Sequence, residues 1–239
     1  MNRVRLDQEL AQRGVTSSRS QAESYIKLGK VKVNGQVVTK PGYFVLNTDR
    51  LDLEAGQQFV SRAALKLASV ANGFKLDFHD KLVLDVGSST GGFTEFALLN
   101  GAAKVIAVEI GTDQMHPKIK SDSKVELHEK TDIRSFQTDK LPDIILADLS
   151  FISLRQILPI LAKLSNFSTQ IVVMLKPQFE TTPKDVQKGV IKNDRLRRQI
   201  IKAFEVWLKT GWIIKNKADS QVAGAKGNQE RFYLLNRSK

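Results

Sequence analysis

The chain has 239 residues, of which 41% are hydrophobic and 26% are charged. Such a length and composition suit a globular protein with one sizeable core and a small second module, and they exclude a disordered, collagenous or repeat protein. Cysteine is absent, which excludes disulfides, thiolate metal sites and any covalent mechanism that begins with a cysteine nucleophile.

The formal net charge of +12 is concentrated at the two ends of the chain. Residues 1–60 hold nine basic and six acidic residues, residues 61–175 hold thirteen of each, and residues 176–239 hold fifteen basic and six acidic residues. Basic end segments around a neutral middle are typical of a protein that binds a polyanion through phosphate contacts. We therefore expect a nucleic acid partner.

The sequence gives no sign of a membrane segment or a metal site. Residues 1–10 carry regularly spaced charges, and no stretch approaches the roughly 20 apolar residues that cross a bilayer. The three histidines, His79, His116 and His128, are far apart. We expect a cytoplasmic protein without a membrane segment or a bound metal.

The first sixty residues predict two short helices followed by a hairpin. A helix over 6–13 ends at Gly14, and Ser17 or Ser18 caps a second helix that runs to about residue 28. Valines then flank Asn34-Gly35, a strong hairpin signal. Basic residues are expected around the helix pair and the start of the hairpin: Arg13, Arg19, Lys27, Lys30 and Lys32.

From residue 61 onward the pattern is that of an α/β domain. A helix over 61–72 precedes nearly continuous apolar strands over 81–87, 104–110, 143–151 and 170–177, which alternate with segments of helical length. This alternation predicts a doubly wound, mostly parallel sheet covered on both faces. A helix over 194–209 and an antiparallel strand pair over 211–217 and 230–236 complete it.

The strongest chemical signal is the segment LVLDVGSSTGGFTEFAL, which predicts a buried strand, a glycine-rich turn and a helix. Ligands bind at such carboxyl ends of parallel strands, where Gly87, Gly91 and Gly92 allow close approach to the backbone. The spacing departs from the dinucleotide fingerprint, and the chain has no nucleoside-triphosphate loop. Pyrophosphate cofactors are therefore disfavoured.

Three acids follow successive strands and indicate a different cofactor. Asp85, expected in the loop region, suits the ammonium of a methionine group; Glu109 suits two ribose hydroxyls, and Asp132 suits an adenine amino group. Ammonium, ribose and adenine together describe S-adenosylmethionine.

Longer motifs extend this interpretation to the whole chain. The segment RLDQELAQRGVTSSRSQAESYIKLGKVKVNGQVV resembles the small RNA-binding domain of the S4 type. The motifs VSRAALKL, LDVGSSTGGFT, ADLSFISL, MLKPQFE and GNQERFYLL make the second part similar to FtsJ-type ribose methyltransferases, and the whole chain resembles the TlyA family. The resemblance implies a Rossmann-like class I methyltransferase domain over 61–239 with an antiparallel terminal strand, preceded by a small α+β RNA-binding domain over 1–60.

The family's activity is methylation of a cytidine ribose oxygen in ribosomal RNA. The resemblance implies a catalytic tetrad of Lys66, Asp148, Lys176 and Glu230. A ribose hydroxyl is a weak nucleophile that needs a positioned base. We expect Lys176 to be that base, with its pKa lowered by Lys66, and Asp148 and Glu230 to orient the lysines and the hydroxyl while opposing that shift.

The remaining site predictions are sets of residues. The expected cofactor-binding residues are Asp85, Gly87, Ser88, Ser89, Thr90, Gly91, Gly92, Phe93, Glu109, Ile110, Asp132, Ile133 and Asp148. The expected RNA-binding residues are Arg5, Arg13, Arg19, Lys27, Lys30, Lys32, Arg62, Lys188, Arg195, Arg197 and Arg198.

Other reactions and functions fit the sequence less well. Methylation of cytosine carbon-5 uses a cysteine, and this chain has none. Methylation of an exocyclic amine uses an Asp/Asn-Pro-Pro-aromatic turn, whereas this chain has Asp148-Leu149-Ser150-Phe151 at that position.

A catalytically silent RNA-binding ribosome-assembly factor stays open as an alternative function, because fold does not guarantee chemistry. So does a membrane-active hemolysin, the name that many family members carry, although no membrane segment supports it. By resemblance alone, the short lead before Arg5 and the short tail after Leu235 favour the large ribosomal subunit as substrate, with the small subunit as a second possibility.

Overall fold

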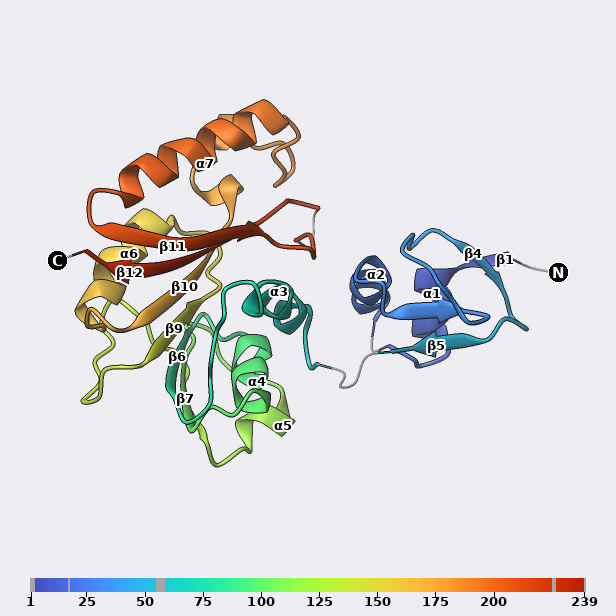
Figure 1. Cartoon of the computed structure of the whole chain (residues 1–239), viewed down its shortest axis with the longest axis horizontal. Helices are drawn as coiled ribbons and strands as arrows, with labels where there is room; N and C mark the ends of the chain where they lie inside the picture. Colours follow the sequence, from blue (N-terminus) through green and yellow to red (C-terminus); the bar gives the residue numbers. More distant parts are fainter. Residues whose placement is uncertain (1–2, 17, 55–58, 225–226, 239) are drawn as a thin grey trace.

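The computed structural model describes residues 3–16, 18–54, 59–224 and 227–238 (Figure 1). It contains two groups of elements. A small α+β group is formed by residues up to 53, and a seven-stranded sheet with helices is formed by residues from 62 onward. Figure 1 shows the first group to one side of the sheet, with helix α2 turned toward helix α3.

The N-terminal group contains the two predicted helices and the predicted hairpin. Helix α1 spans Leu6–Gln12 and α2 spans Arg19–Lys27, whose first turn is capped by the Ser18 hydroxyl accepting from the Gln21 amide. Strands β2 (Val31–Val33) and β3 (Gln36–Val37) are joined by Asn34 and Gly35, which both have positive φ, as a tight hairpin turn requires. These predictions are confirmed.

Three further short strands were not predicted. Strand β1 (Arg3–Arg5) pairs antiparallel with β4 (Phe44–Leu46), and β5 (Leu51–Leu53) pairs with β2 to complete a sheet in the order β3-β2-β5. Each has three residues, too few for a two-residue alternation to stand out.

The second group is a doubly wound sheet, as predicted. Its strands are β6 (Leu82–Val86), β7 (Lys104–Val108), β8 (Val125–His128), β9 (Ile144–Ala147), β10 (Gln170–Leu175), β11 (Trp212–Asp219) and β12 (Arg231–Arg237). Their order is β11-β12-β10-β9-β6-β7-β8, and β12 is antiparallel to both of its neighbours while the other pairs are parallel. The fold class, with its antiparallel terminal pair, is therefore confirmed.

Helices cover both faces of this sheet. Helices α6 (Leu154–Lys163) and α7 (Asp194–Leu208) pack on one face, and α3 (Arg62–Ala71) and α4 (Gly92–Leu99) pack on the other. The short elements are α5 (Pro117–Lys120) and the 3-10 turns η1 (Pro177–Phe179) and η2 (Pro183–Asp185). Because the strand interiors are apolar on both faces, burial on two sides stabilises the sheet.

The chain order reverses beside β6. The chain runs outward from β6 to β7 and β8 on one side, and from β9 to β10 on the other. In such sheets a crevice opens at the carboxyl ends of the two strands that flank the reversal, here β6 and β9. The fold thus places the glycine-rich turn after β6 and the segment after β9 at one site.

The two groups touch through α2 and α3. The Arg62 guanidinium donates to the Ser24 hydroxyl at 3.0 Å and to the Ala223 carbonyl at 2.7 Å. Leu65 and Val222 pack into the core of the N-terminal group. In the described part of the chain, the structure has no helix long and apolar enough to cross a membrane.

Candidate active site

A cavity of about 510 Å³ opens at the carboxyl ends of β6, β7 and β9. Seven of the predicted cofactor-binding residues line it: Gly87, Ser89, Glu109, Ile110, Asp132, Ile133 and Asp148. Because it lies at the strand reversal, the cavity matches the position that the glycine-rich segment predicted. The other six predicted cofactor residues are not part of its lining: Asp85, Ser88, Thr90, Gly91, Gly92 and Phe93.

Asp85 is not in the loop, and that expectation was wrong. It lies inside β6, opposite Ala107 of β7 and Leu146 of β9, and it is fully buried. The Thr94 hydroxyl donates to its Oδ2 at 2.6 Å, while Oδ1 has no hydrogen-bond partner among the described residues. Burial, assisted by the charges of Asp148 and Glu109, raises the pKa of Asp85 to about 7.

Gly87 keeps the floor of the cavity open next to Asp85. It has a φ of +79°, and a Cβ there would lie 2.9 Å from Leu149 and 3.0 Å from the carbonyl oxygen of Asp148. A side chain would therefore push the segment after β9 away from the turn after β6. Only glycine satisfies both the conformation and the spacing.

Glu109 and Asp132 line the cavity, and both carboxylates accept hydrogen bonds from neighbouring residues. The Glu109 carboxylate accepts from the amides of Ser89 at 2.9 Å and Gly111 at 2.8 Å, which ties the glycine-rich turn to the end of β7. Asp132 accepts from the guanidinium and the amide of Arg134, and these hydrogen bonds hold its pKa below its usual range. Both carboxylates are therefore oriented before any ligand binds.

Gly91, Gly92 and Phe93 are packing residues in this structure. Gly91 is the N-cap residue that precedes α4 and lies in the left-handed region, at φ +87°, and Phe93 is 2% exposed beside Phe232. A Cβ on Gly92 would lie 2.2 Å from Ser61 Oγ and 3.0 Å from the Ala64 amide nitrogen. Gly92 thus allows α4 to pack closely against the start of α3.

Gly92→Ala is expected to destabilise the protein by about 1–3 kcal/mol, because overpacking forces the helix backbones apart. Gly211→Ala is the matched control, since its new Cβ would meet nothing within 4 Å. Urea denaturation of both variants measures the difference in the free energy of unfolding. Equal midpoints for the two variants would show that α3 and α4 do not need this close contact.

The four predicted tetrad residues form two ion pairs: Asp148, Lys176 and Glu230 adjoin the ends of β9, β10 and β12, and Lys66 comes from helix α3. Lys176 Nζ lies 2.6 Å from Asp148 Oδ1, and Lys66 Nζ lies 2.6 Å from Glu230 Oε2. Leu175 pairs with Arg231 across β10 and β12, so Lys176 and Glu230 follow and precede the same rung of the ladder. The structure brings the four residues together, with each lysine held by its own carboxylate.

The segment after β9 contributes two residues that the sequence interpretation missed. Ser150 accepts a hydrogen bond from Lys176 Nζ at 2.8 Å. Phe151 lines the cavity, is 90% exposed and has a φ of +65°, a conformation that costs about 1–3 kcal/mol for a residue other than glycine. The available signal was an aromatic residue three positions after the acidic residue Asp148, which follows β9.

Glu180 joins the two segments that carry Asp148 and Lys176. Its buried carboxylate accepts from the Ser153 hydroxyl at 2.7 Å and from the Leu154 amide at 2.6 Å, and burial raises its pKa. The rings of Phe151 and Phe179 add a contact at 5.1 Å between centroids. These contacts hold the segment after β10 against the segment after β9.

The predicted RNA-binding residues of the N-terminal group have mixed environments. Arg5 and Arg19 both bind Asp7, Lys32 pairs with Glu54, and Lys27 and Lys30 are exposed. Arg13 pairs with Glu9 and donates to the carbonyls of Leu46, Asn47 and Asp49. Arg13 therefore holds the loop over 46–49 in place, and part of the hydrogen-bonding capacity of its guanidinium is satisfied within the protein.

Two further predicted arginines, Arg62 and Arg197, have partners within the protein. Arg197 has a side chain 14% exposed, pairs with Asp219 and donates to the Gln229 carbonyl, and Arg62 bridges Ser24 and Ala223 as described above. Their guanidinium groups hold the fold together, a role that exposed-helix reasoning could not reveal. Lys188, Arg195 and Arg198 are exposed, and Arg198 pairs with Asp194.

Family models define the class of protein. Residues 59–237 match the FtsJ-like methyltransferase model, and residues 4–51 match the S4 domain model. The doubly wound sheet with its cavity at the strand reversal is thus the methyltransferase part of an FtsJ-like enzyme that carries an S4 domain.

Individual relatives narrow this class to one family. The chain is 35% identical over 240 residues to the 16S/23S rRNA (cytidine-2'-O)-methyltransferase TlyA of Mycobacterium tuberculosis, covering 98% of this chain and 90% of that protein. It is 38% identical over 193 residues to the 23S rRNA (cytidine-2'-O)-methyltransferase TlyA of Campylobacter jejuni, covering 79% and 76%. A solved structure of a hemolysin-like protein from Streptococcus thermophilus superposes with a TM-score of 0.73 at 32% identity, covering 100% and 90%. The chain belongs to the TlyA family.

Proposed function

We propose that this protein transfers the methyl group of S-adenosylmethionine to the 2'-hydroxyl of a cytidine ribose in ribosomal RNA. The observation that carries this proposal is the ion pair between Lys176 and Asp148, which lines the cavity, together with the ion pair between Lys66 and Glu230 beside the neighbouring strand β12. The names of the relatives in Mycobacterium tuberculosis and Campylobacter jejuni supply the substrate class. The protein would act in the cytoplasm, where ribosomal subunits are assembled.

The residues around the cavity fit S-adenosylmethionine. The buried Oδ1 of Asp85 lacks a partner among the described residues, which suits the ammonium of the methionine group, and Gly87 keeps the backbone accessible. Glu109 suits the ribose hydroxyls and Asp132 the adenine amino group, with Ile110 and Ile133 as apolar walls. When bound, this cofactor supplies a methyl group on a positively charged sulfur.

Lys176 is the proposed general base. Lys176 Nζ would accept the proton of the ribose hydroxyl as that oxygen takes the methyl group, and S-adenosylmethionine would supply the methyl group and leave as the uncharged thioether. Asp148 and Ser150 fix the position of Nζ, since both contact it directly. Lys66 and Glu230 would orient the attacking hydroxyl, because alignment contributes much of the rate in such displacements.

Phe151 and the S4 domain would bind the RNA. Phe151 lines the cavity directly after Ser150, which contacts Lys176, and its exposed ring offers a face on which a nucleobase can stack. The exposed basic residues of the N-terminal group and of α7 would contact phosphates. This division assigns RNA binding mainly to residues 1–60 and methyl transfer to residues 61–239, with the large subunit as the proposed substrate.

The test is transfer of label from tritiated S-adenosylmethionine to ribosomal subunits that lack the modification. We expect label in the RNA of the large subunit. If folded protein that binds S-adenosylmethionine transfers no label to either subunit, the proposal fails and a ribosome-assembly factor without catalysis becomes the better account.

A further inference from the structure

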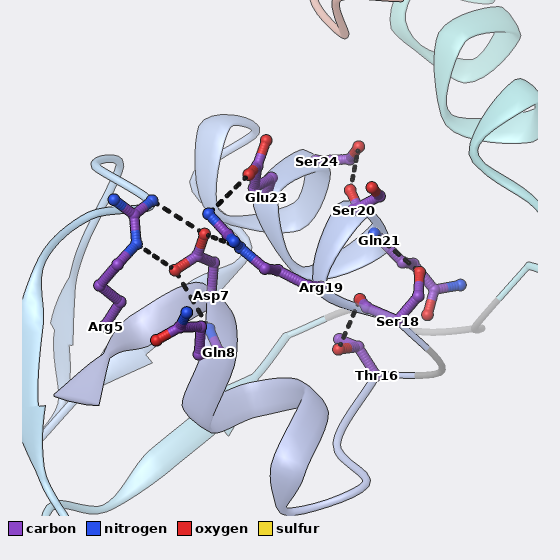
Figure 2. Close-up of polar contacts among 10 residues, drawn as sticks. All are labelled: Arg5, Asp7, Gln8, Thr16, Ser18, Arg19, Ser20, Gln21, Glu23 and Ser24. Carbon is purple, nitrogen blue, oxygen red and sulfur yellow. Dashed lines mark hydrogen bonds and ion pairs between the residues drawn. The ribbon is translucent and has the colours of Figure 1, made fainter. Parts of the chain in front are cut away.

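A fully buried carboxylate lies between two arginines in the N-terminal group (Figure 2). Asp7, in the first turn of α1, accepts two hydrogen bonds from Arg5, each at 2.9 Å, and one from Arg19 Nε at 2.8 Å. Its own neighbour, the Gln8 amide, donates at 3.1 Å. The two arginines come from different elements, β1 and α2, so this carboxylate is the point at which both side chains meet.

Asp7 is held in its charged form. Burial alone would raise the pKa of Asp7, but the hydrogen bonds and charges of Arg5 and Arg19 outweigh burial and hold that pKa below its usual range. A buried charge is tolerated only when it is paired and hydrogen-bonded, as it is here. At neutral pH the cluster therefore contains one negative and two positive groups.

The two guanidinium groups remain available to a ligand. The side chain of Arg5 is 38% exposed and that of Arg19 is 50% exposed, although both are anchored to a buried oxygen. Asp7 uses only Nε of Arg19, and it uses Nε and one terminal nitrogen of Arg5. A guanidinium held in one orientation binds a phosphate with a smaller loss of side-chain entropy than a freely rotating one.

An exposed aromatic residue lies opposite one of the two arginines. Phe44 is directly opposite Arg5 in the β1–β4 ladder and is 59% exposed. Residues opposite each other in an antiparallel pair share a face of the sheet. A fixed arginine beside an exposed ring matches single-stranded or looped RNA, whose phosphates and unstacked bases are both accessible.

We infer that Asp7 is a positioning residue that fixes Arg5 and Arg19 in one arrangement to receive RNA phosphates. The inference rests on the proposed binding of RNA by this protein. It assigns to a carboxylate a favourable role in binding a polyanion. If the arginines acted only through their charge, Asp7 would oppose RNA binding, and its removal would strengthen it.

The two accounts predict opposite effects for Asp7→Asn. The substitution removes a negative charge, yet an asparagine has one acceptor oxygen where the carboxylate has two, and its amide hydrogens face guanidinium donors. We expect the Kd for unmodified 23S rRNA fragments to rise at least tenfold for the full-length variant, measured by fluorescence anisotropy at constant salt. A Kd equal to or below that of the wild type would overturn the inference.

Glu23→Gln is the matched control. Glu23 also faces Arg19, at 3.8 Å, but its side chain is 32% exposed and it makes only this long contact with the arginine. Removing its charge is expected to leave the Kd unchanged or to lower it. If Glu23→Gln weakens binding as much as Asp7→Asn does, then Asp7 has no special positioning role.

Arg5→Lys tests the geometry with Asp7 in place. Lysine keeps the charge but cannot form the two parallel hydrogen bonds, so the Kd should rise about five- to tenfold, and wild-type affinity would contradict a need for fixed geometry. This variant carries the test if Asp7→Asn proves unfolded by circular dichroism.

The wild-type protein separates this inference from the proposed function. Wild-type protein that binds no rRNA fragment would overturn both, whereas wild-type protein that binds RNA without methyl transfer would overturn only the proposed function.

Discussion

Lys176→Ala is expected to lower kcat for methyl transfer by about a thousandfold or more while leaving S-adenosylmethionine binding within about threefold of the wild type. A positioned general base contributes about 10²–10⁴-fold to such a rate, and the substitution also leaves Asp148 without its ion-pair partner. Single-turnover transfer to large ribosomal subunits measures the chemical step, and calorimetry measures cofactor binding.

The control for Lys176 is Lys184→Ala. Lys184 lies eight residues further along the same segment and is exposed, so its removal takes one positive charge from the region without touching the cavity. Its effect should be limited to a modest change in RNA affinity. A Lys176→Ala enzyme that keeps more than a tenth of the wild-type kcat would show that another group accepts the proton.

S-adenosylmethionine affinity is expected to rise about tenfold per pH unit between pH 5 and about 7, and to level off above that. Burial raises the pKa of Asp85 to about 7 in the free protein, whereas an adjacent ammonium favours the ionised carboxylate. Binding below pH 7 must therefore release the proton from Asp85. Calorimetry at pH 6 in buffers of different ionisation enthalpy should detect release of close to one proton.

The same group sets a pH dependence of stability in the free protein. Because the folded-state pKa of Asp85 lies above its unfolded value of 3.8, the folded state retains this proton to higher pH than the unfolded chain does. The contribution of Asp85 to stability is thus complete below pH about 4 and is lost as pH rises to about 7. Asp85→Asn should remove this component from the urea-unfolding profile.

Asp85→Asn should also weaken cofactor binding at pH 7.5 by about thirtyfold or more and abolish proton release. Asp139→Asn is the control, since Asp139 is exposed and lies outside the cavity lining. If Asp85→Asn binds the cofactor as tightly as the wild type, with the same proton release, then another carboxylate receives the ammonium.

The sequence predicted the architecture well because its signals are local. The Asn34-Gly35 turn, the Ser18 cap and the apolar strands each depend on a few neighbouring residues, and all are present. Strands β1, β4 and β5 were missed because three-residue strands are defined by their pairing partners, which lie far along the chain. Short-range patterns cannot show such pairing.

Within the site, residue types were easier to predict than their surroundings. The tetrad positions come together, yet Asp85 proved to be a strand residue that hydrogen-bonds Thr94 rather than a loop residue. The sequence predicted that Arg62 and Arg197 are exposed cations that bind RNA. Both donate hydrogen bonds within the protein, to Ala223 and Gln229, and these partners are too distant in sequence for a local pattern to reveal them. The burial of Asp7 likewise follows from the packing of β1, α1 and α2, which no single segment encodes.

The central claim, that the acceptor is a ribose oxygen, is tested most directly by locating the methyl group in the RNA product. Alkaline hydrolysis cleaves RNA through the 2'-hydroxyl, so a 2'-O-methylated cytidine must be recovered as an alkali-resistant dinucleotide carrying the tritium label. That is the predicted result, and it should disappear with Lys176→Ala. Label recovered in a methylated base within ordinary mononucleotides would contradict the account.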